Sequence, residues 1–220
     1  MPVKSHQEKR NFVSQVKRAK DKTKRTLLAR FLSVAHKAAF PDFISPMLCT
    51  PTPSPMDDPR FLHEVKYDGY RILSYVRSAK VYLKTRKNQN YTSKYPLVVE
   101  ALQKLDVNAV LDGELVVFNE DGRPTFNAIQ TYNGQRTPIT YCIFDILWLD
   151  GHDLTDLPLE TRKSILAAIL SKNEILRYTE SYDDGPGLYQ NMLRRGWEGI
   201  VSKERDSPYI PSVHNRRTDK

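Results

Sequence analysis

The distribution of apolar residues after residue 60 constrains the fold of this chain more than any other sequence feature. Apolar or alternating runs occupy residues 62–76, 81–86, 109–118, 139–149 and 197–203. Turn-forming pairs, Asp121-Gly122 and Asp150-Gly151, follow two of these runs. Short runs bounded by such turns are typical of antiparallel strands. We therefore predict a mainly antiparallel sheet.

Helical periodicity interrupts the strand pattern at three places. We predict amphipathic helices at about residues 95–105, directly after Pro158, and at about residues 188–195, where Gly196 can terminate the helix. The 220 residues, 40% of them hydrophobic, are enough for one sizeable core or two small ones. The predicted class is α+β with mainly antiparallel sheets and flanking helices.

The net charge of +8 is concentrated at the N-terminus. Residues 1–40 carry eleven Lys and Arg against two acidic residues, a net of +9, whereas the other 180 residues carry 23 basic and 24 acidic groups. Six prolines in residues 41–60 exclude regular structure there. We predict a basic helical arm or linker at 1–40 and a globular domain at 41–220. The arm could bind nucleic acid, serve only as a docking helix or linker, or be a mitochondrial transit peptide.

Three charged residues, Glu64, Lys66 and Asp68, alternate within the first apolar run, which would place them on one face of a strand. A solvated sheet face is the ordinary explanation of such a pattern. The alternative is chemical, because a lysine close to an arginine and a metal ion can be neutral, and a neutral amine is a nucleophile.

The string Lys-x-Asp-Gly-x-Arg at residues 66–71 resembles motif I of the covalent nucleotidyltransferases, which comprise ATP-dependent DNA ligases, RNA ligases and mRNA capping enzymes. Similar companions follow in the family's order: Thr85-Arg86, Leu-Asp-Gly-Glu-Leu at 111–115, Tyr-Cys-Ile-Phe-Asp-Ile-Leu at 141–147 and Glu-Gly-Ile-Val-Ser-Lys at 198–203. The resemblance covers about residues 43–220. It implies the nucleotidyltransferase fold of DNA ligase adenylation domains, which is similar to ATP-grasp.

The resemblance also implies the roles of individual residues. Lys66 would be the nucleophile that forms a lysyl-AMP intermediate, with Asp68 and Arg71 as further catalytic residues. Glu114 would bind the ribose hydroxyl or support the metal ion, and Glu198 would hold that divalent ion, Mg²⁺ or Mn²⁺. The implied ATP-binding residues are Glu64, Val65, Lys66, Arg71, Arg86, Glu114, Phe144, Ile200 and Lys203.

Within this implied site, Glu64 would accept a hydrogen bond from the adenine amine, which favours ATP over GTP. Phe144 and Ile200 would sandwich the purine, although a phenylalanine inside an apolar run is more often a core residue. Arg71 and Arg86 would hold the ribose and phosphates, and Lys203 would neutralise the α-phosphate. Strict alternation puts Glu198 and Lys203 on opposite faces, so the implied site requires a bend near Gly199.

Four strings, at residues 43–48, 64–71, 144–151 and 206–209, resemble the ligase module of bacterial multifunctional end-joining DNA ligases and their stand-alone relatives. The implied function is transfer of AMP to the 5′-phosphate of nicked or broken double-stranded DNA during repair, in the cytoplasm and associated with the nucleoid. An RNA ligase, a capping-type enzyme and a non-catalytic nicked-DNA-binding fragment remain alternatives. No membrane association is expected, because no run of eighteen apolar residues occurs.

This family normally continues into motif V, a Trp-x-Lys-x-Lys strand, and an OB-fold domain. The sequence ends with Arg217-Thr218-Asp219-Lys220, about where motif V would follow. We therefore expect an adenylation domain truncated before motif V, with the OB-fold domain absent and supplied in cis or in trans. Its activity alone is expected to be partial, because phosphate contacts would be missing.

Overall fold

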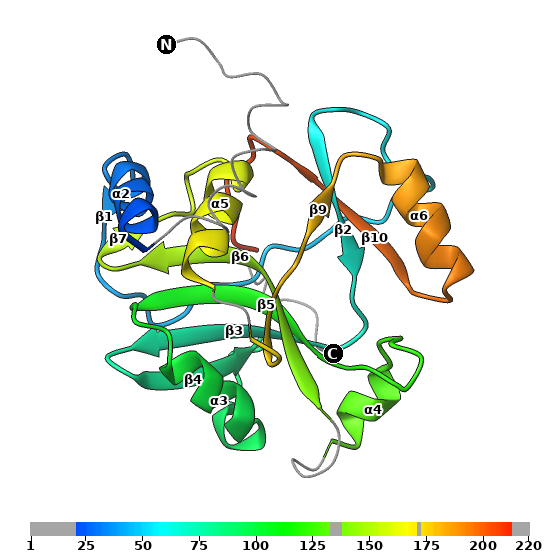
Figure 1. Cartoon of the computed structure of the whole chain (residues 1–220), viewed down its shortest axis with the longest axis horizontal. Helices are drawn as coiled ribbons and strands as arrows, with labels where there is room; N and C mark the ends of the chain where they lie inside the picture. Colours follow the sequence, from blue (N-terminus) through cyan, green and yellow to red (C-terminus); the bar gives the residue numbers. More distant parts are fainter. Residues whose placement is uncertain (1–20, 133–137, 171–172, 213–220) are drawn as a thin grey trace, which may run out of the picture.

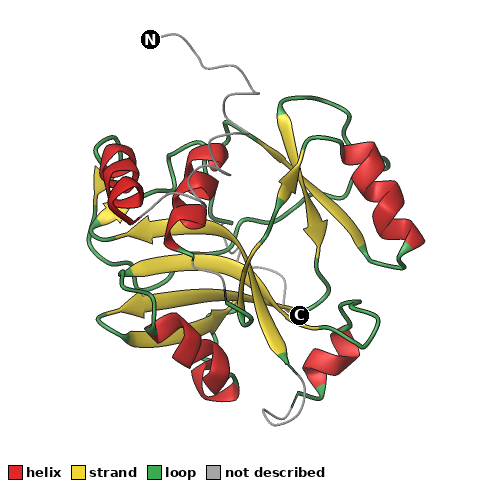
Figure 2. Ribbon diagram, in the orientation of Figure 1, coloured by secondary structure: helices red, strands yellow, loops and turns green. Residues whose placement is uncertain are grey.

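The computed structural model describes residues 21–132, 138–170 and 173–212, and within them the strands form two sheets (Figures 1 and 2). The larger sheet has the order β1-β7-β6-β5-β3-β4, with β8 beside β6, and the smaller has the order β10-β2-β9. The only parallel pair among these described strands is β6 with β8. The predicted α+β class with mainly antiparallel sheets is therefore confirmed.

The larger sheet consists of β1 (His36–Lys37), β3 (Tyr70–Arg77), β4 (Lys80–Thr85), β5 (Ala109–Val117), β6 (Ile139–Leu149), β7 (His152–Asp153) and β8 (Leu176–Tyr178). The smaller sheet consists of β2 (Phe61–Lys66), β9 (Ser181–Tyr182) and β10 (Gly199–Glu204). The helices are α2 (Asp21–Leu32), η1 (Thr92–Lys94), α3 (Pro96–Gln103), α4 (Phe126–Gln130), α5 (Leu159–Ile169) and α6 (Gly185–Arg194).

Each sheet has its own helical cover. Helices α3 and α5 contribute Val98, Leu102 and Leu166 to the main core on one face of the larger sheet. The opposite face of that sheet carries a second cluster around Leu73 and Trp148, against which residues 38–47 pack. Helix α6 packs on the smaller sheet, on its outer side in Figure 1.

The predicted run 62–76 is divided between the two sheets, which the sequence pattern did not indicate. Strand β2 ends at Lys66 in the smaller sheet, and β3 begins at Tyr70 in the larger one. Gly69 permits this crossing, because a Cβ atom there would lie 2.0 Å from the carbonyl oxygen of Leu115. The motif at residues 66–71 therefore spans the junction between the sheets.

The structure confirms the turn predicted at Asp150-Gly151 and the helix end predicted at Gly196, but α6 starts earlier than predicted. Asp150 and Gly151 have φ angles of +41° and +88° and connect β6 to β7, which confirms the turn predicted there. Gly196 has a φ of +67° just after α6, as predicted. Helix α6 begins three residues earlier than expected, because Asp184 caps it by accepting a 2.8 Å hydrogen bond from the Gly187 amide.

The described part of the predicted arm packs on the body. Leu28, Phe31 and Leu32 of α2 contact the main core, and β1 pairs with β7. The arm's first twenty residues lie outside the described residues. No helix in the described part of the chain is long and apolar enough to cross a membrane.

Candidate active site

Lys66 lies at the C-terminal end of β2 and forms an ion pair with Glu198. Strand β10 begins one residue after Glu198, at Gly199, whose φ of +146° is one that side-chain-bearing residues rarely adopt. Glu198 therefore precedes β10 and does not follow the alternation of its side chains. Gly199 supplies the bend that the predicted site needed between Glu198 and Lys203. The lysine and the carboxylate predicted to hold a metal are brought into direct contact.

The register of β2 and β10 decides which side chains face the larger sheet. Glu64 pairs with Val201, and it contacts Lys203 farther along the same face. The opposite face carries His63 and Ser202, whose side chains lie 2.9 Å apart at Nδ1 and Oγ. This second face meets α6, since a Cβ on Gly185 would lie 2.6 Å from the His63 ring.

This register corrects one predicted role. Ile200 pairs with Val65, so both side chains share the α6 face with Ser202 rather than the face of Glu64 and Lys203. Ile200 therefore does not lie opposite Phe144. Val201 occupies the position from which a side chain can do so.

Glu64 is buried and forms three polar contacts. Lys203 Nζ donates to Oε2 over 2.6 Å, while Lys163 Nζ and Ser181 Oγ donate to Oε1, the latter over 3.0 Å. Burial by itself raises the pKa of the Glu64 carboxyl, but the two lysines outweigh it and the net pKa lies below the ordinary value. Glu64 is therefore an anionic hydrogen-bond acceptor.

Phe144 is directed away from the core by a β-bulge. Asp112 of β5 pairs with Asp145 and Gly113 pairs with Ile143, so Phe144 is the extra residue of β6. It is partly exposed, whereas the other residues of β6 are buried. Gly113 makes the bulge possible, because a Cβ atom there would lie 2.6 Å from the carbonyl oxygen of Cys142.

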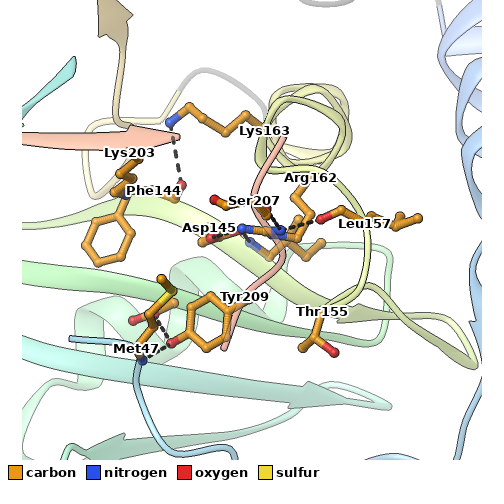
Figure 3. A network of polar contacts seen from close by, with 12 residues as sticks. Met47, Phe144, Asp145, Thr155, Leu157, Arg162, Lys163, Lys203, Ser207 and Tyr209 are labelled. Atoms are coloured by element: carbon orange, nitrogen blue, oxygen red, sulfur yellow. Dashed lines mark hydrogen bonds and ion pairs between the residues drawn. The ribbon is translucent and has the colours of Figure 1, made fainter. Parts of the chain in front are cut away.

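Two cations approach the Phe144 ring. The Arg71 guanidinium carbon lies 4.5 Å and Lys203 Nζ 4.3 Å from its centroid. Figure 3 places Lys203 next to this ring. Phe144 is therefore a functional aromatic candidate rather than a core residue.

Arg71 is held in place by a carboxylate that sequence reasoning did not assign to the site. Its Nε and Nη2 donate to Asp112 over 2.5 and 2.7 Å. The Tyr209 hydroxyl donates to the same carboxylate over 2.6 Å and accepts from the Met47 amide over 2.9 Å (Figure 3). Burial alone lowers the pKa of Arg71, but Asp112 reverses this and keeps the guanidinium charged. Asp112 orients Arg71 toward Phe144.

Asp68 and Arg86 form none of the hydrogen bonds and ion pairs described above. Asp68 nevertheless acts electrostatically on Glu114, as Lys66 does. Asp68 follows the end of β2, so it does not share a strand face with Lys66 as the alternation suggested. Arg86 is exposed directly after β4, where continuation of the β3–β4 register would place it opposite Arg71.

Glu114 and Glu198 fit a magnesium-type site. Both carboxylates lie near Lys66, Glu198 by direct contact and Glu114 by electrostatic interaction. No group of three His, Cys, Asp or Glu side chains within the described residues could enclose a metal ion. Mg²⁺ commonly takes one or two carboxylates and completes its shell with water and substrate phosphates. The pair therefore suits an ion that arrives with a nucleotide.

Glu114→Gln should raise the stability of the protein at high pH while it lowers the amount of nucleotide adduct. Burial raises the pKa of Glu114 to about 8 from an ordinary 4.5, although Arg71 opposes the increase. The folded protein thus holds a proton that the unfolded chain releases between these values, and stability should fall as the pH rises through this window. The interval from 4.5 to about 8 corresponds to at most about 5 kcal/mol, at about 1.4 kcal/mol per pH unit. The variant should lack this loss and melt up to roughly 10–20 °C higher than wild type at pH 8.5.

Thermal melting between pH 5 and 9 measures this effect, with Glu100→Gln on an exposed helix position as the control. Identical pH profiles of wild type and Glu114→Gln would contradict the prediction. The same variant should form less nucleotide adduct, because an amide is a poorer metal ligand than a carboxylate.

Lys163 is the site residue that sequence reasoning missed most clearly. It belongs to α5, where Leu159, Lys163 and Leu166 recur at spacings of four and three, and Leu170 follows four residues later as the C-cap. A lysine on the apolar face of a predicted helix was a signal for a buried charge with a partner. The identity of that partner, Glu64, 99 positions away in the chain, was not readable from the sequence.

Comparison with known proteins agrees with this geometry. The family model described as "ATP dependent DNA ligase domain" matches residues 46–220. The multifunctional non-homologous end joining protein LigD of Pseudomonas aeruginosa is 35% identical over 79% of this chain and 21% of its own length. The SPbeta prophage-derived DNA ligase-like protein LigB of Bacillus subtilis is 32% identical over 76% of this chain and 63% of its own length. This chain thus spans about a fifth of the first relative and less than two thirds of the second.

Solved structures match in the same region. The ligase domain of Mycobacterium tuberculosis LigD has a TM-score of 0.69 at 30% identity, over 77% of this chain and 57% of that chain. Mycobacterial DNA ligase D complexed with ATP has a TM-score of 0.68 at 31% identity, over 77% and 56%. This chain therefore belongs to the ATP-dependent DNA ligase family and has the fold of its adenylation domain.

Proposed function

We propose that this chain forms a covalent lysyl-AMP intermediate at Lys66, the first step of ATP-dependent DNA ligation. The observation that carries this proposal is the ion pair between Lys66 and Glu198 at the junction of the two sheets. Lys66 Nζ attacks the α-phosphorus of ATP, the new P–N bond forms, and the bond to pyrophosphate breaks. The ammonium must first lose a proton, and the Glu198 carboxylate is in position to receive it.

The surrounding residues supply binding and charge. The purine lies against Phe144 with Val201 opposite, and its amine donates to Glu64. Lys203 and Arg71 neutralise the phosphates, and exposed Arg86 adds to the ribose and phosphate contacts. A divalent ion, Mg²⁺ or Mn²⁺, held by Glu114 and Glu198, would offset further negative charge in the transition state. Asp68, two residues after Lys66 and electrostatically coupled to Glu114, is a further catalytic residue of this step.

The acceptor of the AMP is the 5′-phosphate of nicked or broken double-stranded DNA, and the process is double-strand break repair. The names of the LigD relatives, which refer to non-homologous end joining, support this choice. Nick sealing would use an OB-fold domain in cis or in trans. The basic residues 1–40 would strengthen binding to DNA, in the cytoplasm at the nucleoid.

Intact-mass spectrometry after incubation with ATP and Mg²⁺ tests the proposal. We expect a mass increase of one AMP with ATP, little increase with GTP, and loss of the adduct on addition of pyrophosphate, because the step is reversible. An unmodified mass after prolonged incubation, with and without an added OB-fold domain from a relative, would overturn it.

A further inference from the structure

Lys163 is a buried lysine whose ammonium group is directed at the predicted adenine-binding carboxylate. Its side chain is 2% exposed, and its Nζ forms an ion pair with Glu64. The same nitrogen donates to the carbonyl oxygen of Thr179 over 2.9 Å and approaches that of Phe144 at 3.5 Å. Three acceptors around one buried ammonium fix its position.

Lys163 and Lys203 hold Glu64 from two sides but are not equivalent. Lys163 extends from α5 and Lys203 from β10 (Figure 3). The Lys203 side chain is 22% exposed and lies over the ring of Phe144, the surface on which the purine would stack. It also occupies Oε2 of Glu64, while Oε1 is taken by Lys163 and Ser181.

A purine on Phe144 that donates its amine to Glu64 requires the positions that Lys203 occupies. Binding therefore means that Lys203 exchanges Glu64 for a phosphate of the nucleotide. Glu64 would then be a buried carboxylate with one remaining cation. A buried carboxylate that loses its counter-charge takes up a proton and becomes a hydrogen-bond donor as well as an acceptor.

We propose that Lys163 is a specificity-determining positioning residue, which keeps Glu64 an anionic acceptor while Lys203 moves to the nucleotide. Glu64 then accepts from the 6-amino group of adenine and rejects the 6-oxo group of hypoxanthine or guanine, which offers only an acceptor. This inference rests on the function proposed above. Lys163 need not touch the nucleotide, since it acts through Glu64.

The test compares ATP with ITP, whose base has a 6-oxo group and no 2-amino group. Rates of adduct formation are measured by intact mass for wild type, Lys163→Met, Lys163→Arg and Ser164→Ala. Ser164 is a matched control, because it neighbours Lys163 on α5 but donates to the Glu160 carbonyl. We expect Lys163→Met to raise the ITP/ATP ratio of kcat/KM about tenfold or more, with partial restoration in Lys163→Arg and no change in Ser164→Ala.

A folded Lys163→Met protein with an unchanged ITP/ATP ratio would overturn the inference and leave the proposed function intact. Absence of an adduct on wild type would instead overturn the proposed function itself. If circular dichroism shows that Lys163→Met is unfolded, Lys163→Gln replaces it, because its amide can still donate to Glu64 but supplies no counter-charge. A second comparison uses Glu64→Gln and Glu64→Gln/Lys163→Met.

In the Glu64→Gln background, removal of Lys163 should leave the ITP/ATP ratio unchanged, since the residue acts only through the carboxylate. A shift in the ratio that persists in this background would contradict the inference. A double variant that is unfolded as well would also overturn it, because the role of Lys163 would then be independent of the Glu64 charge.

Discussion

Lys66→Ala is expected to abolish the AMP adduct, and Lys66→Arg is expected to do the same. Alanine removes the nucleophile, and an arginine guanidinium is not deprotonated in proteins, so it cannot attack the α-phosphorus. Both variants should still fold, because the Lys66 side chain is 44% exposed and its ion pair with Glu198 lies near the surface. Intact-mass spectrometry with ATP and Mg²⁺ measures the loss.

Lys80→Ala is the matched control for this experiment. Lys80 is an exposed lysine at the start of β4, where it pairs with Arg77 at the end of the strand remote from Arg86. The Lys80→Ala variant should form the AMP adduct at the wild-type rate. Persistence of an adduct in Lys66→Ala, mapped by peptide analysis to another lysine, would assign the nucleophile elsewhere.

Asp145→Ala should have the largest effect on folding. Asp145 accepts from Nε and Nη2 of Arg162 over 2.8 and 3.0 Å, and both side chains are at least 95% buried (Figure 3). Removal of the carboxylate leaves a buried guanidinium without its counter-charge, which costs about 3–5 kcal/mol. Because domains of this kind are stable by only about 5–15 kcal/mol, the variant should be close to unfolding.

Urea denaturation followed by circular dichroism measures this loss of stability. The double variant Asp145→Leu/Arg162→Met should be less destabilised than Asp145→Ala, because it buries no charge. It should not fully regain wild-type stability, since Arg162 also donates to the carbonyl oxygens of Leu157 and Ser207. A loss below about 1 kcal/mol in Asp145→Ala would contradict the assigned role of the pair.

Local patterns were sufficient to predict most of the framework. The strand predicted at 139–149 coincides with β6. The one predicted at 109–118 extends one residue beyond β5, and the one predicted at 81–86 is shifted by one residue relative to β4. These predictions succeeded because alternation and turn chemistry act between residues close in the chain. The same local rule failed at residues 62–76, since it does not indicate which sheet each half of an apolar run joins.

The facing of the site side chains depended on partner strands. Phe144 leaves the core because β5 sets a bulge opposite Gly113, and Val201 rather than Ile200 shares the face of Glu64 because β2 sets the register of β10. A shift of one residue reverses every side chain of a strand. The strand sequence alone therefore could not determine which of the two residues faces the same side as Glu64.

The sequence by itself determined the α+β class and the ordered series of motifs, and it singled out Lys66 as the candidate nucleophile, because these depend on residue type and short spacing. Only the tertiary structure decided which charges meet. Lys66 contacts Glu198, Arg71 is held by Asp112, and Lys163 reaches Glu64. Each pair joins residues far apart in the chain. Pairing of β2 with β10 and of β3 with β5 brings the first two pairs within ion-pair distance, and packing of α5 brings Lys163 to Glu64.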